Sequence, residues 1–316
     1  MSRDPTAVSC AGKYPSPRLR SRVLNLLPES LQSLAFGCFL ELPTLIFRRR
    51  VCELYFGAKI SLDLCAFLQR YIYFFGFWEP NISCAVTDML KSGDVFVDVG
   101  AHVGYDTLLA ASLVGGSGSV YSFEADPNTY AFLAAHIDIN KLTNVIAMNV
   151  AVTNQRGSVD LFRPNQNNSG QNSIICGRDM QKVATVRGGP IDAFIPEGDR
   201  LRVRLIKIDV EGAEQAVLSG ILSDVTLLRN QPDFIVEISN PRQFWGSEVM
   251  RSLKSYGYKP YSINNDYSLR FYLEWSRPAT PTLLARPPRA QTDVLFSSTW
   301  GSRLAPQSRS PASLSP

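Results

Sequence analysis

The chain is poor in histidine and has no paired cysteines, which narrows the chemistry that it can perform. Only two of its 316 residues are histidines, His102 and His136, so a metal site built from several histidine ligands is excluded. The six cysteines form neither a C-x-x-C pair nor another metal-ligand spacing. Scattered single cysteines are typical of thiols in a reducing compartment, and we therefore expect a cytoplasmic protein without a metal centre.

Long uninterrupted apolar runs are also missing. The most apolar early stretch, residues 26–47, is interrupted by Glu29, Glu41 and Pro43, so we expect no integral membrane segment. The first 25 residues lack the apolar core of a signal peptide. They contain Arg and Ser and few acids, which keeps an organelle transit peptide open as an alternative to a plain cytoplasmic location.

Positive charge is confined to the two ends of the chain. The net charge is +4, but residues 1–28 carry five Lys or Arg against one acid, and residues 277–316 also carry five against one. The body between them therefore has a net charge of −4, which argues against a broad nucleic-acid-binding surface. We expect residues 1–28 to be a flexible basic leader and residues 301–316 a disordered tail.

Residues 29–90 form an apolar and aromatic region ahead of the first clear strand. Leu, Phe, Tyr and Cys recur there at helix-like intervals, which predicts a helical lead-in that packs on the following domain. The aromatic cluster of residues 71–78 favours core packing. Because it leads directly into the first strand, it could instead cover one side of a ligand site.

Strands and helices alternate from residue 91 to about residue 300, and this spacing predicts an α/β fold with a doubly wound, mainly parallel seven-stranded sheet. The polar and β-branched residues of 156–190 predict an inserted β-hairpin region. We expect helices from residue 105, over 128–140, 213–222 and 243–256. We expect strands at 95–99, 119–123, 145–152, 205–210, 234–238, 261–262, 269–273 and 293–297.

Four acidic residues fall at or near the carboxyl ends of predicted strands: Asp98, Glu124, Asp209 and Glu237. In open α/β sheets these ends face one crevice in which ligands bind, so we expect the four carboxylates to share a site. The alternative for each residue is a helix cap or a turn former.

The first strand is followed by a glycine turn that resembles a nucleotide-binding loop without its usual spacing. Gly100 and Gly104 flank the turn, and Glu124 follows 20 residues after Gly104, as expected for an acid that binds ribose hydroxyls. The turn is not G-x-G-x-x-G, so it fits a pyrophosphate poorly. An acid two positions before the first glycine, here Asp98, suits a ligand whose cationic amine reaches the turn. S-adenosylmethionine has such an amine and a ribose diol, and its sulfonium is a further positive charge.

Five segments, taken in order, resemble the FkbM family of S-adenosylmethionine-dependent methyltransferases. They are DVFVDVGAHVGYDT, SFEADP, NVAVTNQRGSVDLF, IKIDVEGAEQAVLSG and FIVEI, within roughly residues 76–300. The resemblance implies a class I methyltransferase domain over residues 91–300 that acts on a hydroxyl of a sugar, glycan or natural-product-like small molecule. It implies a cofactor site formed by Asp98, Gly100, Ala101, His102, Gly104, Glu124 and Ala125. The family commonly has Asn at the position of His102.

Methyl transfer to a hydroxyl requires that the acceptor lose a proton. By the same resemblance Asp209 lies close to the transferred methyl, and we expect it to act as the general base or to orient the acceptor. Glu211 and Glu237 are further candidates for the catalytic role. Helix capping by Asp209 and Glu211 is the alternative, and Mg²⁺ bound by these three acids is another.

The polar segment 164–173 offers donors and acceptors to a hydroxylated substrate, or is a solvated hairpin loop. Two other functions stay open at this point. One is a nicotinamide-dependent oxidoreductase of Rossmann type, and the other is a methyltransferase-like scaffold without turnover. The sequence does not determine the oligomeric state.

Overall fold

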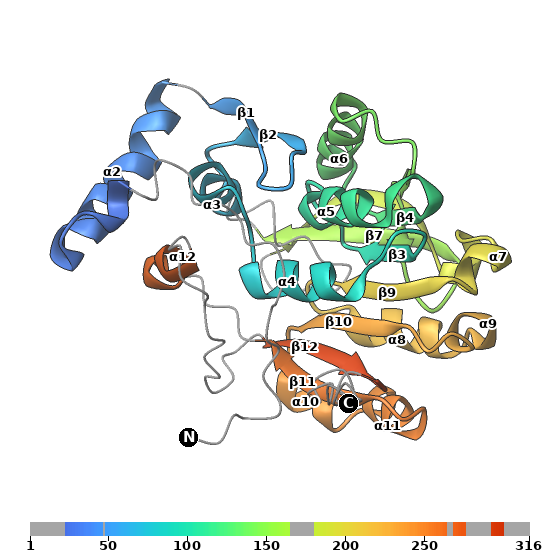
Figure 1. Ribbon diagram of the computed structural model, residues 1–316. Helices are drawn as coiled ribbons and strands as arrows, with labels where there is room; N and C mark the ends of the chain where they lie inside the picture. The colour runs from blue at the N-terminus through green and yellow to red at the C-terminus, as the bar shows by residue number, and fades with distance from the viewer. Residues whose placement is uncertain (1–22, 47, 165–179, 264–267, 276–291, 300–316) are drawn as a thin grey trace, which may run out of the picture.

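The computed structural model describes residues 23–46, 48–164, 180–263, 268–275 and 292–299 (Figure 1). The expected tail lies outside these residues, as do most of the expected leader and all but the first residue of the polar segment 164–173. No helix in the described part of the chain is long and apolar enough to cross a membrane.

A seven-stranded sheet forms the centre of the molecule, with the order β11-β12-β10-β9-β3-β4-β5. The five neighbouring strands from β10 to β5 are parallel, β12 pairs antiparallel with β10, and β11 pairs antiparallel with β12 at the edge. This arrangement confirms the predicted doubly wound, mainly parallel sheet. The strands are β3 (Val95–Val99), β4 (Ser119–Phe123), β5 (Val145–Met148), β9 (Val203–Ile208), β10 (Asp233–Ile238), β11 (Lys259–Ile263) and β12 (Thr292–Ser297).

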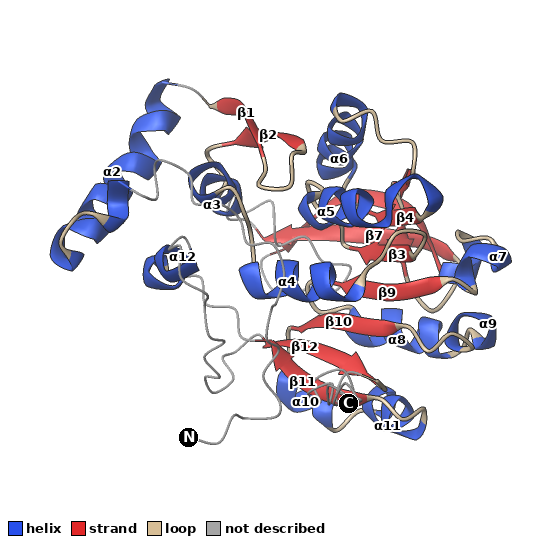
Figure 2. Cartoon of the chain, viewed as in Figure 1, coloured by secondary structure: helices blue, strands red, loops and turns tan. Residues whose placement is uncertain are grey.

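Helices cover both faces of the sheet (Figure 2), because apolar residues point alternately to the two sides of each strand. In β3, Phe96 packs on one side with α4 and α5, and Val97 packs on the other side with α8, α9, α10 and α11. The helices are α4 (Pro80–Met89), α5 (Tyr105–Val114), α6 (Pro127–Ile139), α8 (Glu214–Leu222), α9 (Val225–Leu228), α10 (Pro241–Trp245) and α11 (Glu248–Ser255).

The inserted region forms a second, three-stranded sheet with the order β6-β8-β7. Its strands are β6 (Ala151–Val152), β7 (Gly157–Pro164) and β8 (Met180–Gly189), of which the last two pair antiparallel as the expected hairpin. The strand predicted over 145–152 is therefore two strands, β5 and β6, in different sheets. A short helix, α7 (Glu197–Arg200), leads from the insertion back to β9.

The lead-in contains helices, as expected, but also a hairpin that the sequence analysis did not predict. Its helices are α2 (Glu29–Ile46) and α3 (Phe67–Phe75), followed by α4, and between α2 and α3 lies the hairpin of β1 (Arg49–Glu53) and β2 (Lys59–Asp63). In β2 the apolar Ile60 and Leu62 alternate with polar residues and are fully buried. This two-residue period is the signal that the helical interpretation overlooked.

The strand predicted at 269–273 is wrong, because these residues belong to helix α12 (Leu269–Trp275). Aromatic residues favour strands on a half-buried sheet, but here tertiary packing prevails. Tyr272 is fully buried and stacks on Phe77, with ring centroids 5.5 Å apart. The predicted packing role of the 71–78 cluster is confirmed, since most of its aromatic side chains are buried in the same core.

One histidine ties the lead-in to the glycine turn. The Nδ1 atom of His136, on α6, lies 2.7 Å from the carbonyl oxygen of Val103 within the turn. Its Nε2 atom lies 2.9 Å from the backbone nitrogen of Ser61 in β2, which donates to it. The side chain is 1% exposed, so His136 acts as a buried structural link between these segments. Figure 1 shows α3, β1 and β2 beside the turn that follows β3.

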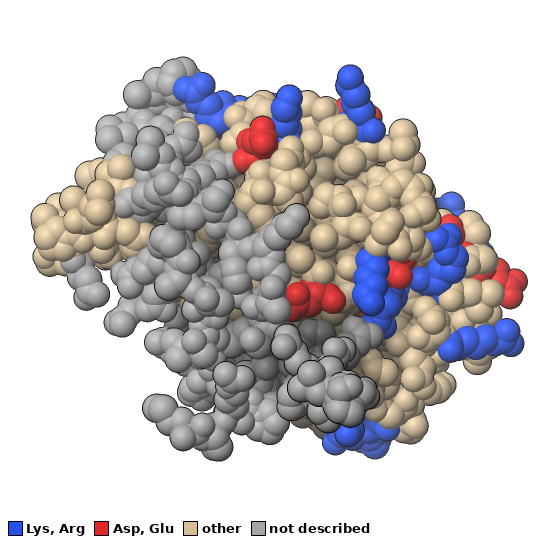
Figure 3. Space-filling model, viewed as in Figure 1, with Lys and Arg blue, Asp and Glu red and all other residues tan. Residues whose placement is uncertain are grey.

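Charged side chains are distributed over the described surface without one dominant patch on the face in view. Figure 3 shows Lys and Arg in several separate places, with Asp or Glu next to some of them. The surface ion pairs are accordingly local, such as that of Lys182 with Asp160 at 2.8 Å.

Replacing Gly100 by alanine tests how tightly the turn is packed against the sheet. Gly100 has a φ of 83°, and an added Cβ would lie 1.7 Å from the carbonyl oxygen of Asp209. We expect Gly100→Ala to lower the free energy of unfolding by about 3 kcal/mol or more, because backbone strain and overpacking both contribute. Urea unfolding followed by circular dichroism measures the change.

Gly116→Ala is the matched control, since nothing lies within 4 Å of the added Cβ. It should change the free energy of unfolding by no more than about 0.5 kcal/mol. Equal stability of the two variants would contradict the close contact between the turn and Asp209.

Candidate functional site

A cavity of about 460 Å³ lies at the carboxyl ends of β3, β4, β9 and β10. The strand order reverses between β3 and β9, which is where open α/β sheets bind ligands. Of the four acids expected to share this crevice, Glu124, Asp209 and Glu237 line the cavity. Asp98 is not among the described residues that line it.

Acidic residues far outnumber basic residues in the described lining of the cavity. Lys207 is the one lysine or arginine among the described lining residues. The acidic lining residues are Glu79, Asp106, Glu124, Asp126, Asp209, Glu211 and Glu237. The apolar lining residues include Phe67, Leu68 and Trp78 from the lead-in, and Val152 and Leu161 from the inserted sheet. The cavity is therefore anionic in character, with apolar walls supplied by two regions outside the central sheet.

The backbone around the cavity is strained. The described residues other than glycine with positive φ are Glu79, His102, Lys141, Glu211 and Gln231. Three of these five, Glu79, His102 and Glu211, line the cavity. Such conformations persist where the surrounding structure holds them, and they concentrate at functional sites.

Glu124 is held in place by the backbone of the turn. It follows β4, is 9% exposed, and its Oε2 atom accepts a hydrogen bond of 2.8 Å from the backbone N–H of His102. Its Oε1 atom accepts another of 2.8 Å from the N–H of Asp126. Burial raises the pKa of Glu124 to about 7, although both hydrogen bonds oppose the rise. The carboxyl group thus has a fixed orientation and remaining lone pairs toward the cavity.

Asp126 lines the cavity at the same end as Glu124. It caps α6 by accepting from the backbone N–H groups of Asn128 and Thr129. Its Oδ2 atom accepts a 2.7 Å hydrogen bond from Arg163 of β7. The inserted sheet is in this way fixed to the edge of the cavity.

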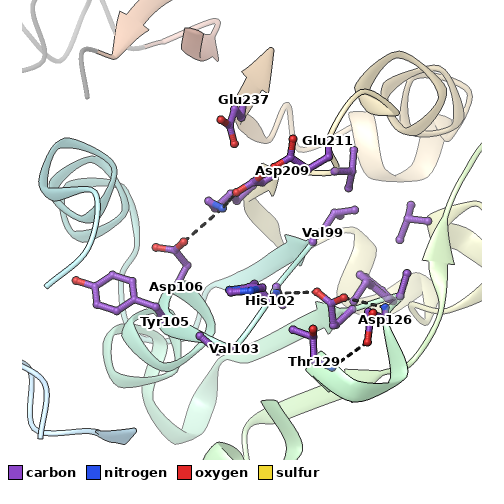
Figure 4. Close-up of a pocket in the computed structure, with 18 of the residues that line it drawn as sticks. Val99, His102, Val103, Tyr105, Asp106, Asp126, Thr129, Asp209, Glu211 and Glu237 are labelled. Atoms are coloured by element: carbon purple, nitrogen blue, oxygen red, sulfur yellow. Dashed lines mark hydrogen bonds and ion pairs between the residues drawn. The ribbon is translucent and has the colours of Figure 1, made fainter. Parts of the chain in front are cut away.

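Lys207 organises the opposite end. It is 5% exposed, and its Nζ atom lies 3.0 Å from Oδ2 of Asp209 and 3.4 Å from Oδ2 of Asp106. Burial alone would lower the pKa of Lys207, but these two carboxylates raise it well above its usual value. The ammonium group is therefore permanently charged. Figure 4 shows Asp106 and Asp126 on opposite sides of His102.

Asp209 and Glu237 share one negative charge. Burial would raise the pKa of Asp209, but Lys207 and a hydrogen bond from Glu237 lower it below its usual value. The charge of Asp209, burial and the same hydrogen bond raise the pKa of Glu237 to about 12. Glu237 is accordingly protonated near neutral pH and donates to an ionised Asp209.

Glu211 differs from both of these acids. It follows β9, has a φ of 49°, and burial together with the charge of Asp209 raises its pKa to about 7. Its carboxyl group can therefore gain or lose a proton near neutral pH. His102, on the other side of the cavity, has its pKa lowered by burial and is neutral there.

Asp98 and Gly104 are not among the described residues that line the cavity. Asp98 is fully buried in β3, and its Oδ2 atom accepts a 2.6 Å hydrogen bond from the hydroxyl of Thr107. Gly104, with a φ of 90°, packs against Leu133 of α6. Both residues support the conformation of the turn through these contacts. Gly100, Ala101, His102, Glu124 and Ala125 line the cavity itself.

A metal site is not formed by these acids. Among the described residues, no group of three or more His, Cys, Asp or Glu side chains is arranged to hold a metal ion. The alternative in which Asp209, Glu211 and Glu237 bind Mg²⁺ therefore has no structural support within that part of the chain.

Four charged lining residues were not identified from the sequence as site residues: Glu79, Asp106, Asp126 and Lys207. Lys207 interrupts the apolar run LIKI, which is a usable signal, because a cation in a buried strand needs an acidic partner. Asp106 stands in the first turn of a helix, where an acid is already favoured by the helix dipole. Glu79 is brought to the cavity by the lead-in, and its neighbours in sequence give no such signal.

Comparisons with known proteins point to one family. The family model described as "Methyltransferase FkbM domain" matches residues 98–260, just over half of the chain. Hexuronic acid methyltransferase AglP of Haloferax volcanii is 23% identical over 143 residues, which are 45% of this chain and 56% of that protein. The chain thus spans little more than half the length of this curated relative.

Two solved structures are also similar. Methyltransferase FkbM from Methylobacillus flagellatus KT has a TM-score of 0.39 and 15% identity, with 65% of this chain and 43% of that chain covered. TYW2 of M. jannaschii, in complex with AdoMet, has a TM-score of 0.42 and 13% identity, with 79% and 84% covered.

Removing the ammonium group of Lys207 tests the charge arrangement of the site. In Lys207→Met the buried Asp106 and Asp209 lose their cation, so we expect the free energy of unfolding to fall by about 3–5 kcal/mol at pH 8. Without the cation, burial raises the folded-state pKa of both carboxyls above the unfolded value. The folded state then binds more protons, and the stability of the variant falls as the pH rises from about 5 to 8.

The control is Lys182→Met, which breaks the exposed pair with Asp160. Urea unfolding at pH 5 and pH 8 should show little change for that variant at either pH. A Lys207→Met variant that is as stable as the parent at pH 8 would show that the carboxylates do not depend on this ammonium group.

Proposed function

Because the chain belongs to the FkbM methyltransferase family, we propose that it transfers a methyl group from S-adenosylmethionine to a hydroxyl group of a sugar, glycan or similar small molecule. The observation that carries this proposal is the geometry of Glu124. A buried carboxylate, fixed by two backbone N–H groups beside the glycine turn, is suited to accept hydrogen bonds from the two hydroxyls of a ribose.

The charge of the cavity supports the same cofactor. Seven acidic residues and one lysine line it. Glu237 is protonated, and Glu124 and Glu211 have pKa values of about 7, so the excess of negative charge grows as the pH rises through 7. A cation is therefore favoured over a polyanion in the cavity. S-adenosylmethionine brings a positive sulfonium, which carries the methyl group that is transferred. A nicotinamide dinucleotide brings a pyrophosphate, which these carboxylates would repel. The oxidoreductase alternative is therefore the weaker of the two.

The three acids expected to be catalytic have different protonation states and therefore suit different tasks. Glu237 is protonated and cannot accept a proton. Asp209 is ionised but is stabilised by Lys207, which makes it a weak base suited to orienting an acceptor hydroxyl. Glu211, with a pKa of about 7, is the best matched general base near neutral pH. Retention of such a group argues against a scaffold that has lost turnover.

A sugar or glycan acceptor is supported by the relative from Haloferax volcanii, whose name is hexuronic acid methyltransferase AglP. The apolar wall of Phe67, Leu68 and Trp78 provides a surface on which the face of a sugar ring could pack. We propose the cytoplasm as the compartment, which agrees with the scattered cysteines.

Binding of S-adenosylmethionine tests the proposed function. Isothermal titration of the full chain should show binding of S-adenosylmethionine but not of NADH. In Glu124→Gln the affinity at pH 7.5 should fall about 10- to 100-fold, because hydrogen bonds to a charged group contribute about 1.5–3 kcal/mol. Since the pKa of Glu124 is about 7, the parent should bind more tightly as the pH rises from 6 to 7.5, and the variant should not.

Incubation with methyl-labelled S-adenosylmethionine and an extract of glycans and small molecules should then label an acceptor. Binding of NADH in place of S-adenosylmethionine would overturn the proposed function. An unchanged affinity in Glu124→Gln would remove its main structural support.

The general base is tested with the acceptor that the labelling identifies. Glu211→Gln should lower kcat by about 10²–10⁴-fold and abolish the rise of kcat with pH near 7, because the neutral amide cannot accept the proton. The KM for S-adenosylmethionine should stay close to that of the parent. Retention of the same pH profile in Glu211→Gln, with its loss in Asp209→Asn, would assign the base to Asp209 instead.

A further inference from the structure

Asp106 carries a buried oxygen atom that the proposed reaction does not yet use. The residue is 7% exposed and lines the cavity. Its Oδ2 atom contacts Lys207, whereas its Oδ1 atom has no hydrogen-bond partner among the described residues. A buried carboxylate oxygen without a partner is costly, which indicates that a ligand group completes this contact.

Asp106 lies toward the end of the cavity opposite Glu124. Asp106 lies in the first turn of α5, directly after the glycine turn, and contacts Lys207 of β9. Glu124 follows β4, and β9 and β4 flank β3 on opposite sides. β9 and β4 are therefore separated by two strand spacings, roughly 10 Å. A nucleoside with its ribose at Glu124 and a short amino-acid chain across the turn would bring its far end to Asp106.

The charges near Lys207 favour a second cation at this point. Asp209 is already satisfied, because it lies 3.0 Å from the ammonium of Lys207 and accepts a hydrogen bond from Glu237. Asp106 shares the same ammonium at the longer distance of 3.4 Å. Of the two carboxylates, Asp106 is thus the one with a buried oxygen, Oδ1, that has no hydrogen-bond partner among the described residues.

We propose that Asp106 binds the α-ammonium group of the methionyl end of S-adenosylmethionine through its Oδ1 atom. Lys207 is the positioning residue, because its ammonium group lies 3.4 Å from Oδ2 of Asp106 and fixes the orientation of the carboxyl group. The inference rests on the proposed function and refines the expected site, since it gives to Asp106 the contact with the amine that the sequence suggested for Asp98. Asp98 is fully buried, bonded to Thr107, and not among the described lining residues.

Binding of three ligands distinguishes contacts to the amino-acid end from contacts to the nucleoside end. S-adenosylmethionine and S-adenosylhomocysteine both carry the ammonium group, and only the first carries the sulfonium charge. 5′-Methylthioadenosine has the same adenosine portion but no amino-acid end. Isothermal titration of all three, at pH 7.5, should be made on the full-length parent, on Asp106→Asn, and on Asp98→Asn as the matched variant of a neighbouring buried acid.

In Asp106→Asn the affinities for S-adenosylmethionine and S-adenosylhomocysteine should both fall about 10- to 100-fold, the effect of losing one hydrogen bond to a charged group. The affinity for 5′-methylthioadenosine should change by no more than about twofold, within the effect expected away from the altered contact. Asp98→Asn should leave the ratio of affinities for S-adenosylmethionine and 5′-methylthioadenosine as in the parent, even if its melting temperature shifts.

The inference is overturned if Asp106→Asn binds S-adenosylhomocysteine as tightly as the parent does, or if it weakens all three ligands equally. A change of the affinity ratio in Asp98→Asn alone would return the amine contact to Asp98. If the parent binds none of the three ligands, the proposed function fails together with the inference. If the parent binds them and Asp106→Asn treats them alike, only the inference fails.

Discussion

A single buried ammonium group, that of Lys207, determines which carboxyl groups of the cavity are charged. It lies within 3.4 Å of both Asp106 and Asp209, and its charge offsets the cost of burying them. Ionised Asp209 in turn keeps Glu237 protonated and, with burial, brings the pKa of Glu211 to about 7. One cation in β9 thus gives the neighbouring carboxyl groups different pKa values. Asp209 is a fixed anion, Glu237 a hydrogen-bond donor and Glu211 a candidate base within one small site.

The second constraint is the glycine turn, which is held from three directions. Asp209 packs against Gly100, Glu124 accepts from the N–H of His102, and Nδ1 of His136 donates to the carbonyl oxygen of Val103. The last contact also reaches β2 of the lead-in through Ser61. Residues outside the matched family region therefore support the turn and, through Phe67 and Trp78, line the cavity. The lead-in therefore contributes both to the support of the turn and to the wall of the cavity.

Much of this architecture could be predicted from the sequence, because strands buried on both faces and followed by apolar helices leave a strong pattern. The same pattern predicts the point at which the strand order reverses. It therefore also predicts that Glu124, Asp209 and Glu237 lie together. Side-chain direction was harder to predict. Asp98 and Asp106 stand eight positions apart in one motif, and only the packing of α5 determines that the first is buried with Thr107 while the second faces the cavity. The hairpin of β1 and β2 does leave a local signal, the two-residue period of β2, but the helix α12 depends on contacts with distant aromatic residues, which local patterns do not contain.

The most direct measurement is a crystal structure of the full chain with S-adenosylhomocysteine bound. The account predicts the ribose hydroxyls within hydrogen-bonding distance of the Glu124 carboxylate and the amino-acid end across the glycine turn, on the side of Lys207. A ligand bound elsewhere, or in the cavity with its ribose away from Glu124, would contradict it.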